Sequence, residues 1–277
     1  MKNRELLIIT GITGFIGSHI LSKLQAFEKG YEIVGFSSNK IYRIINTELH
    51  EISGLSLINL IKKTKRASLI HLATFYSLKE KHKEEIIKAN EQFGYDLFDS
   101  YGIKEFNKII YTNSIFTFSN DEKIKKSTYV KTKKNFSGFL KEYSDENSSS
   151  FTEIFLGNTI GKNDSRPKLI PKIISSLKNN EVSPISNPEQ YINLVPVTVV
   201  ADMVLGEVLK ESNKYSIISK FDYKISSIYE FCKNEVNQHK GEDIVKQITK
   251  EKELLPANIR ASEININLEK ELRLLIS

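Results

Sequence analysis

The sequence has 277 residues, of which 40% are hydrophobic, enough to bury the core of one large domain or of one domain with a small appendage. Its 40 basic and 34 acidic side chains leave a net charge of +6 spread along the chain, so no nucleic-acid partner is indicated. One cysteine, Cys232, excludes an internal disulfide, and without a cysteine/histidine cluster no metal site is expected.

The apolar run at residues 6–9 is too short for the hydrophobic part of a signal peptide, and glycines follow it at once. No apolar stretch approaches the length that spans a bilayer. A chain with a single thiol is typical of a reducing compartment. We therefore predict a soluble cytoplasmic protein with no membrane partner.

Strands and helices alternate in the first part of the chain. Strands are predicted at residues 6–10, 32–36, 68–73, 108–112 and 151–156. Helices are predicted at residues 15–27, 86–100 and 130–143, with a lysine-rich helical stretch before residue 68. This alternation predicts an α/β fold with a doubly wound parallel sheet that binds its ligand at the carboxyl ends of the strands.

The rhythm changes after Gly157. Helices are expected near residues 169–178, 227–238 and 241–250, among loops and a proline-bearing stretch. We find no repeat, linker or low-complexity segment. The prediction is a first domain over residues 1–160, with a return segment near 190–210, and a small C-terminal lobe over residues 161–277.

A glycine-rich turn, Gly11-Ile12-Thr13-Gly14-Phe15-Ile16-Gly17, separates the first predicted strand from the first helix. Its spacing is GxxGxxG, which differs from the GxGxxG of ordinary dinucleotide-binding dehydrogenases. Glycines at a strand-to-helix turn allow a tight bend and let the backbone approach a pyrophosphate closely. A turn without a ligand is the alternative, but the flanking strand and helix favour dinucleotide binding.

The end of the second strand indicates which dinucleotide is bound. An acidic residue there normally receives the ribose hydroxyl of NAD. Here the segment is Ser37-Ser38-Asn39-Lys40, and Arg43 follows. Without a carboxylate to repel a 2′-phosphate, and with two cations to attract one, the segment favours NADPH over NAD. The alternative is that these are ordinary polar loop residues.

Three side chains form a candidate catalytic group. Tyr129 and Lys133 lie four residues apart, hence on one face of the predicted helix. A lysine ammonium near a tyrosine lowers the pKa of its hydroxyl and makes it a better proton donor. Ser114 follows a predicted strand and can bind a substrate carbonyl at the sheet edge.

The sequence resembles the extended short-chain dehydrogenase/reductase family over nearly its whole length. The matching stretches are GITGFIGSHI (from Gly11), LIHLAT (from Leu69), KAN (from Lys88), YTNS (from Tyr111), YVKTK (from Tyr129) and LGNTIG (from Leu156). The resemblance implies a Rossmann-like dinucleotide-binding domain, a small substrate-binding lobe, and catalysis by Ser114, Tyr129 and Lys133.

The resemblance also implies roles for individual residues. Cofactor contacts fall on the glycine turn (Gly11, Thr13, Gly14, Phe15, Ile16, Gly17), on Ser37, Ser38, Asn39, Lys40 and Arg43, and on Leu72, Ala73, Thr74, Tyr129 and Lys133. Substrate contacts fall on Thr74, Tyr76, Ser114, Asn158 and Lys168. His71 and Asn90 are typically structural in the family. A homodimer through the helices that follow Ala89 and Tyr129 is usual.

Within the family, HLATFY from His71 and TNSIF from Thr112 are similar to short reductases that make CDP-abequose or CDP-paratose for surface polysaccharides such as the O-antigen of lipopolysaccharide. Two features depart from the family. Ile192-Asn193 and Thr198-Val199 replace its later arginine and acidic pair, and Phe155 replaces a common arginine. These departures weaken the inference of substrate phosphate contacts from relatives.

The predicted reaction is NADPH-dependent reduction of a nucleotide-linked 4-keto-deoxyhexose. Sugar dehydratases place an Asp-Glu pair after the catalytic hydroxyl residue, where this chain has Ile115-Phe116, so dehydration is disfavoured. One alternative is an NAD-dependent nucleotide-sugar 4-epimerase. The other is a cofactor-binding protein without catalysis, which the presence of all three catalytic residues disfavours.

Overall fold

The computed structural model describes residues 4–64, 66–101, 106–164, 166, 168–182, 184–210, 214–217, 221–238, 243–248, 259–261 and 266–277. The chain divides into two units. The first comprises Met1–Phe155 and Ala201–Ser216, and the second comprises Leu156–Val200 and Ile217–Ser277. Among the helices of the described ranges, none combines the length and the apolar character that crossing a membrane requires.

Parallel strands form the centre of the first unit. They are β1 (Glu5–Thr10), β2 (Tyr31–Ser37), β5 (Ala67–His71) and β6 (Phe106–Ser114), with β1 paired to β2 and β5, and β5 paired to β6. The side chains of residues 6–9 are fully buried, as expected of a parallel strand covered on both faces. Beyond β6 the sheet continues through β7 (Ser150–Leu156) to β10 (Lys214–Ile217).

An antiparallel extension lies beyond β2. It consists of β3 (Lys40–Ile45) and β4 (Glu48–Ile52), paired in the order β2-β3-β4. The β3–β4 turn is Asn46-Thr47, with φ values of 51° and 63°. Two consecutive left-handed residues between paired strands are the mark of a type I′ hairpin turn. No strand was predicted between residues 36 and 68, because the alternation of Ile41 and Ile44 with polar residues is short.

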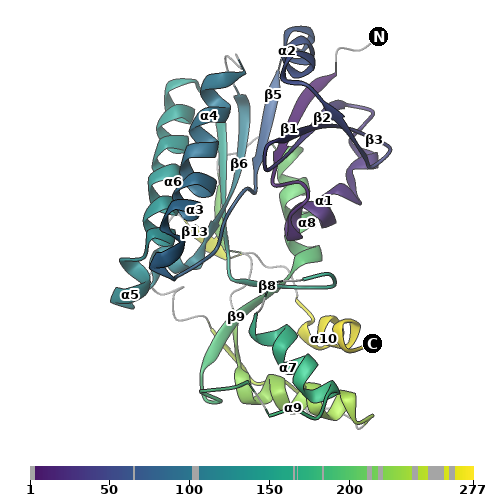
Figure 1. The fold of residues 1–277 in the computed structure, drawn as a ribbon, viewed down its shortest axis with the longest axis vertical. Coiled ribbons are helices and arrows are strands. Elements are labelled where there is room, and N and C mark those ends of the chain that lie inside the picture. Colours follow the sequence, from purple (N-terminus) through teal and green to yellow (C-terminus); the bar gives the residue numbers. More distant parts are fainter. Residues whose placement is uncertain are drawn as a thin grey trace. The chain divides into compact units, whose positions relative to one another are not determined.

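Helices of the first unit flank this sheet, and Figure 1 shows α3, α4 and α6 running alongside one another next to β5 and β6. The α-helices are α1 (Phe15–Leu21), α2 (Gly54–Lys63), α3 (Lys83–Ile87), α4 (Phe93–Ser100), α5 (Glu122–Lys125) and α6 (Thr128–Glu146). The short turns are η1 (Leu24–Ala26), η2 (Glu80–His82), η4 (Ile115–Phe118) and the π-helical η3 (Lys88–Gln92), which joins α3 to α4.

The start of α6 is fixed by its own sequence. Ser127 is the N-cap, and its hydroxyl accepts a hydrogen bond from the backbone N–H of Val130 (3.3 Å). The inner face of the helix carries Phe136 and Leu140, which pack with Tyr111 of β6 in the core of the first unit. Because α6 begins at Thr128, Tyr129 and Lys133 follow on this same buried side, one turn apart.

The second unit has its own sheet and core. Its strands are β8 (Asn158–Ile160), β9 (Tyr191–Pro196), β11 (Phe221–Lys224), β12 (Lys246–Ile248) and β13 (Ile259–Ala261), of which four pair in the order β12-β11-β9-β8. Its helices are α7 (Leu169–Lys178), α9 (Ile225–Val236) and α10 (Leu268–Ile276). Helix α8 (Val197–Val208) begins in this unit and continues into the first.

Most predicted elements are present, two expectations need correction, and one element was not predicted. The first helix ends at Leu21 and not at residue 27, and the separate turn η1 follows it. The hairpin of β3 and β4, at residues 40–52, is the element that was not predicted. Of the helix predicted at residues 241–250, the described part is the strand β12, whose backbone pairs with β11, preceded by residues 243–245 without regular structure. Residues 241, 242, 249 and 250 lie outside the described ranges.

Candidate active site

The predicted glycine turn joins β1 to α1 at the carboxyl edge of the parallel strands. Gly11 adopts φ +70°, and a Cβ atom there would lie 3.0 Å from the backbone nitrogen of Ala73. At Gly17 a Cβ atom would lie 2.2 Å from the carbonyl oxygen of Gly11. Both positions therefore require glycine, for backbone conformation at the first and for space at both. The resulting turn brings backbone groups together without side chains between them, as a pyrophosphate site requires.

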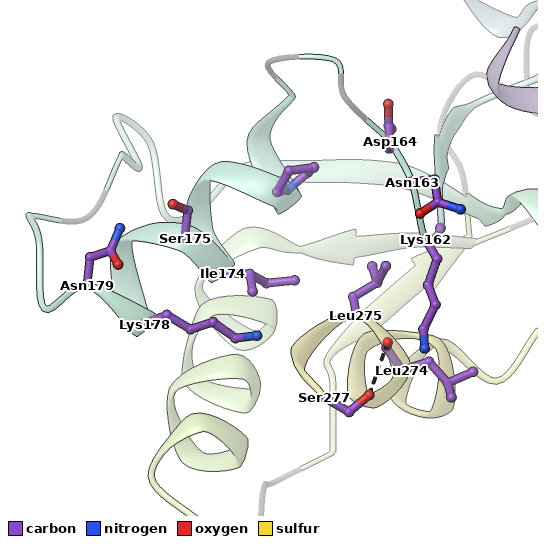
Figure 2. A pocket seen from close by; sticks show the side chains of 12 residues that line it. Lys162, Asn163, Asp164, Ile174, Ser175, Lys178, Asn179, Leu274, Leu275 and Ser277 are labelled. Atoms are coloured by element: carbon purple, nitrogen blue, oxygen red, sulfur yellow. Dashed lines mark hydrogen bonds between the residues drawn. The ribbon is translucent and has the colours of Figure 1, made fainter.

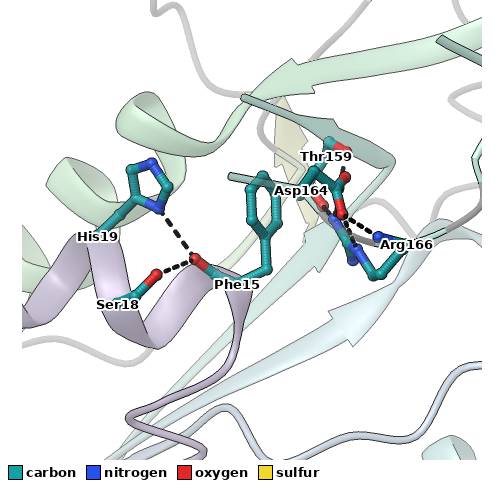
Figure 3. A network of polar contacts seen from close by, with 6 residues as sticks. All are labelled: Phe15, Ser18, His19, Thr159, Asp164 and Arg166. Atoms are coloured by element: carbon teal, nitrogen blue, oxygen red, sulfur yellow. Dashed lines mark hydrogen bonds and ion pairs between the residues drawn. The ribbon is translucent and has the colours of Figure 1, made fainter. Parts of the chain in front are cut away.

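The end of β5 is held against the end of β1. The Thr10 hydroxyl accepts hydrogen bonds from the backbone N–H groups of Leu72 and Ala73, both at 3.1 Å. This brings the predicted cofactor residues 72–74 next to the glycine turn. In the turn itself, the Phe15 carbonyl accepts a hydrogen bond from the Ser18 hydroxyl (3.0 Å), and His19 Nδ1 lies 2.9 Å from the same oxygen (Figure 3).

The end of β2 meets the glycine turn through a hydrogen bond between the hydroxyls of Ser37 and Thr13. Ser38 follows in the left-handed region, with φ 51°, and Asn39 leads into β3. The Lys40 ammonium lies 2.7 Å from the Glu51 carboxylate of β4. The residues that end β2 include no acidic side chain, as the sequence indicated, but β4 brings the Glu51 carboxylate to Lys40.

Arg43 lies farther from this edge. It pairs with Val34, three residues before the end of β2, and its guanidinium is 2.5 Å from the Glu32 carboxylate. The two predicted cations thus differ in how exposed their ion pairs are. Lys40 and Glu51 are each more than half exposed (57% and 56%), whereas the Glu32 side chain that holds Arg43 is only 15% exposed.

The three predicted catalytic residues belong to β6 and α6 of the first unit. Ser114 ends β6, and its hydroxyl oxygen accepts a hydrogen bond from the N–H of Phe116 (3.2 Å). Lys133 Nζ donates to the carbonyl oxygen of Thr112 (3.0 Å), two residues before Ser114, and to the hydroxyl of Thr74 (2.6 Å). Lys133 therefore ties α6 to the ends of β5 and β6, with Tyr129 one helical turn away.

Lys133 is buried, with 2% of its surface exposed. Burial lowers the pKa of its ammonium to about 7, and the charge of Glu153 acts in the opposite direction. Glu153 lies on β7 and is itself 4% exposed. Its Oε1 accepts hydrogen bonds from Asn113 Nδ2 and from the Ser137 hydroxyl, both at 2.6 Å. Sequence reasoning missed Glu153, although one acidic residue within the apolar segment 151–156 was a usable signal.

Aromatic rings adjoin Tyr129, the predicted proton donor. Tyr76 contacts Tyr129 edge to face, with ring centroids 5.0 Å apart, and stacks on Phe116 at 6.1 Å. Asn90, in the turn η3, holds this segment in place, because its amide accepts from the N–H of Phe75 (2.8 Å) and donates to the Phe75 carbonyl (3.3 Å). The predicted substrate residue Tyr76 thus lies beside the predicted catalytic residue Tyr129.

The other two predicted substrate residues lie in the second unit, which is described by itself. Asn158 Nδ2 donates to the Asn193 carbonyl (3.3 Å). Burial and the charge of Arg166 lower the pKa of Lys168 to about 8. Arg166 in turn forms two bonds to the Asp164 carboxylate (2.5 and 2.8 Å) and one to the Thr159 hydroxyl (3.1 Å) (Figure 3).

The second unit also contains a pocket of about 620 Å³ (Figure 2). The segment after β8, including Lys162, forms one side, and Ile174 and Lys178 of α7 with Leu274 of α10 form others. None of the predicted site residues is among the described residues that line this pocket. It therefore adds no support to the predicted substrate contacts.

The positions that depart from the family's pattern have structural contacts. Asn193 is buried, and its Nδ2 donates to the Phe221 carbonyl (3.0 Å) and to the Asp222 carboxylate (3.3 Å). Within the first unit, Phe155 packs on Phe118 with ring centroids 4.7 Å apart. Neither side chain replaces the charge of the arginine and acidic residues expected at these places.

Curated proteins similar to this chain include CDP-abequose synthases. The chain is 25% identical over 212 residues to that of Salmonella muenchen, which covers 76% of this chain and 71% of the relative. It is 23% identical over 249 residues to that of Yersinia pseudotuberculosis, which covers 84% of this chain and 85% of the relative.

Solved structures with a similar fold include two 4-epimerases. The UDP-N-acetylglucosamine 4-epimerase of Bacillus cereus aligns with a TM-score of 0.71 at 14% identity, over 98% of this chain and 95% of that one. The UDP-glucose 4-epimerase of Thermotoga maritima, solved with UDP-glucose, aligns with a TM-score of 0.69 at 18% identity, over 98% and 97% of the chains. At these identities the likeness concerns the fold. The family profile of the NAD dependent epimerase/dehydratase family matches residues 7–210, and the chain belongs to this family.

Proposed function

We propose that this protein uses NADPH to reduce the keto group at carbon 4 of a nucleotide-linked deoxyhexose. The observation that carries the proposal is the anchoring of Lys133 to Thr112 and Thr74, which fixes the tyrosine and lysine of α6 at the strand end that Ser114 closes. The similarity to CDP-abequose synthases supports a CDP-linked sugar as the first substrate to test.

Each side chain has a defined task in this reaction. The nicotinamide group, when bound, supplies the hydride. Tyr129 donates its proton to the oxygen at carbon 4, which becomes an alcohol. The Ser114 hydroxyl accepts from the Phe116 N–H, so its own hydrogen is free to bind the same substrate oxygen. The Lys133 ammonium favours loss of the Tyr129 proton electrostatically.

The surroundings of Tyr129 support a deoxygenated sugar. The side chains after Ser114 are Ile115 and Phe116, and the Phe116 ring stacks with Tyr76 beside Tyr129. Apolar rings cannot replace the hydrogen bonds that a sugar hydroxyl makes with water, so they favour a substrate with carbon–hydrogen bonds on that side. We expect a 3,6-dideoxy-4-keto sugar to be reduced faster than its 3-hydroxylated counterpart.

The catalytic assignment is tested by oxidation of NADPH in the presence of a CDP-4-keto-3,6-dideoxyhexose. Tyr129→Phe removes the proton donor and should lower kcat by about 100-fold or more, with cofactor binding retained. Tyr143→Phe is the control on the same helix, because its hydroxyl accepts a hydrogen bond from the Phe106 N–H (3.1 Å). It should keep kcat. Full activity of Tyr129→Phe would rule out the mechanism.

The same assay separates a reductase from a 4-epimerase. A reductase consumes one NADPH for each keto sugar converted. A 4-epimerase interconverts two hydroxylated sugars without net consumption of cofactor. Interconversion of two CDP- or UDP-hexoses with no NADPH oxidation, by the protein as purified, would favour the epimerase.

The preference for NADPH is proposed to depend on Lys40 and not on Arg43. An exposed ion pair such as Lys40–Glu51 is weak, so a 2′-phosphate can take the place of Glu51 at little cost. Arg43 is held by the less exposed Glu32, away from the end of β2. Lys40→Ala should raise the KM for NADPH by about tenfold and leave that for NADH unchanged. Glu51→Gln, which frees Lys40, should have the opposite effect on NADPH.

A further inference from the structure

Glu153 is a buried carboxylate that accepts a hydrogen bond from Asn113, the residue before Ser114. It comes from β7, and its neighbours 152 and 154 are fully buried. Both of its described hydrogen bonds end on Oε1, with Asn113 Nδ2 and the Ser137 hydroxyl as donors. An atom that accepts two short hydrogen bonds is suited to an ionised carboxylate, which is an acceptor only.

The Asn113 amide transmits the position of Glu153 to the catalytic serine. Asn113 Nδ2 donates to Glu153, which leaves Oδ1 to accept the backbone N–H of Ser114 at 2.7 Å. The amide is therefore fixed at both ends, with its oxygen and nitrogen assigned by their partners. Because Ser114 is the residue that closes β6, this contact sets the backbone from which its hydroxyl projects.

Glu153 also supplies a charge that Lys133 needs. The two described acceptors of Lys133 Nζ, Thr112 O and Thr74 Oγ1, are neutral. An ammonium surrounded by neutral acceptors in a buried site loses its proton readily unless a negative charge is near. Burial lowers the pKa of Lys133, and the charge of Glu153 acts against that shift. Burial likewise raises the pKa of Glu153, and its hydrogen bonds from Ser137 and Asn113 and the charge of Lys133 act against that shift.

We propose that Glu153 is a positioning residue, which orients Ser114 through Asn113 and keeps Lys133 positively charged during the reaction. This inference rests on the proposed function for its effect on rate. Its effect on Lys133 does not depend on which substrate the protein uses. The glycine turn and the Tyr129–Lys133 pair, on which the sequence prediction is based, do not indicate a role for an acidic residue at position 153.

Several other titratable groups lie near Lys133 and Glu153. Those that act on them or on their neighbours are Lys141 and Tyr129 on α6, Tyr111 on β6, His71 on β5, Glu91 in η3 and Tyr95 on α4. Burial lowers the pKa of His71 to about 3, and burial raises that of Tyr111 well above its ordinary value. These two buried neighbours of Lys133 therefore stay neutral across the range in which Lys133 titrates.

The decisive variant is Glu153→Gln, whose side-chain oxygen can still accept from Asn113 and Ser137 while the charge is removed. The control is Thr152→Val, a change of similar size at the next buried residue of β7. Reduction needs a charged Lys133, so the rate falls as pH rises through the pKa of Lys133. In Glu153→Gln that fall should move to lower pH by about one unit, whereas Thr152→Val should follow the wild type.

A second measurement does not depend on turnover. In protein labelled with ¹³C at the lysine Cε atoms, the Lys133 resonance is identified by its absence in Lys133→Met, and its chemical shift is followed against pH. The titration midpoint should be lower in Glu153→Gln than in wild type. If the wild type reduces no keto sugar but this midpoint still moves, the proposed function fails and the coupling of Glu153 to Lys133 stands.

An unchanged midpoint together with an unchanged pH–rate profile in Glu153→Gln would overturn the inference. If Glu153→Gln does not fold, Ser137→Ala provides the test. It removes one donor from Glu153, favours protonation of the carboxylate, and should move the Lys133 midpoint in the same direction by a smaller amount. No movement in that variant would overturn the inference equally.

Discussion

Acid stability should depend strongly on His71. Its ring is 1% exposed and packs against Phe136 (centroids 4.8 Å apart) and Tyr111 (5.8 Å), and neither ring nitrogen has a hydrogen-bond partner among the described residues. Burial, with a smaller contribution from the Lys133 charge, lowers the pKa of His71 from 6.5 to about 3. The folded state therefore requires a neutral ring that the unfolded chain protonates below pH 6.5.

The size and sign of the effect follow from this difference. Above pH 6.5, His71 does not reduce the free energy of unfolding. Below pH 6.5 the free energy of unfolding falls by about 1.4 kcal/mol for each pH unit, until the folded-state pKa of about 3 is reached. Between about pH 7.5 and about pH 5, His71 alone should account for a loss of about 2 kcal/mol. His71→Leu, of similar volume, removes this loss.

Urea unfolding at both pH values measures the effect. The wild type should lose about 2 kcal/mol more than His71→Leu when the pH is lowered from about 7.5 to about 5. Phe93→Leu is the control, because it changes a ring next to His71 and leaves the imidazole in place. Its free energy of unfolding should fall in parallel with the wild type. An equal loss of the free energy of unfolding in His71→Leu and in the wild type between the two pH values would refute the reasoning.

Three further predictions concern other parts of the molecule. Gly17→Ala places a methyl group 2.2 Å from the Gly11 carbonyl oxygen and should weaken cofactor binding, measured by calorimetry, by about tenfold or more. In the control Gly138→Ala on α6, no atom lies within 4 Å of the added methyl group, and the substitution should stabilise the fold by up to about 1 kcal/mol. Asn90→Leu removes three hydrogen bonds and should cost about 2–3 kcal/mol in urea unfolding, more than Thr132→Val, which removes one of them. Burial raises the pKa of the Cys232 thiol to about 12, so iodoacetamide should label it rapidly only after unfolding; rapid labelling of the folded protein would contradict its burial.

The sequence by itself determined the features whose signals are local. The apolar run of β1 and the glycines after it each act over a few residues, so the strand and the turn could be predicted from spacing. The order of Ser114, Tyr129 and Lys133 along the chain then indicated the catalytic group. The hairpin of β3 and β4 escaped prediction because each strand is short and its stability depends on pairing with β2.

Only the tertiary structure determines which charged and polar side chains contact one another. Lys133 reaches Thr74, 59 residues away, and Asn113 reaches Glu153, 40 residues away, because parallel strands bring their carboxyl ends to one edge. The antiparallel register of β2, β3 and β4 likewise gives Lys40 and Arg43 their carboxylate partners. A sequence shows the charge of a side chain, but its burial and its partners, which set its pKa and its use, depend on elements distant in the chain.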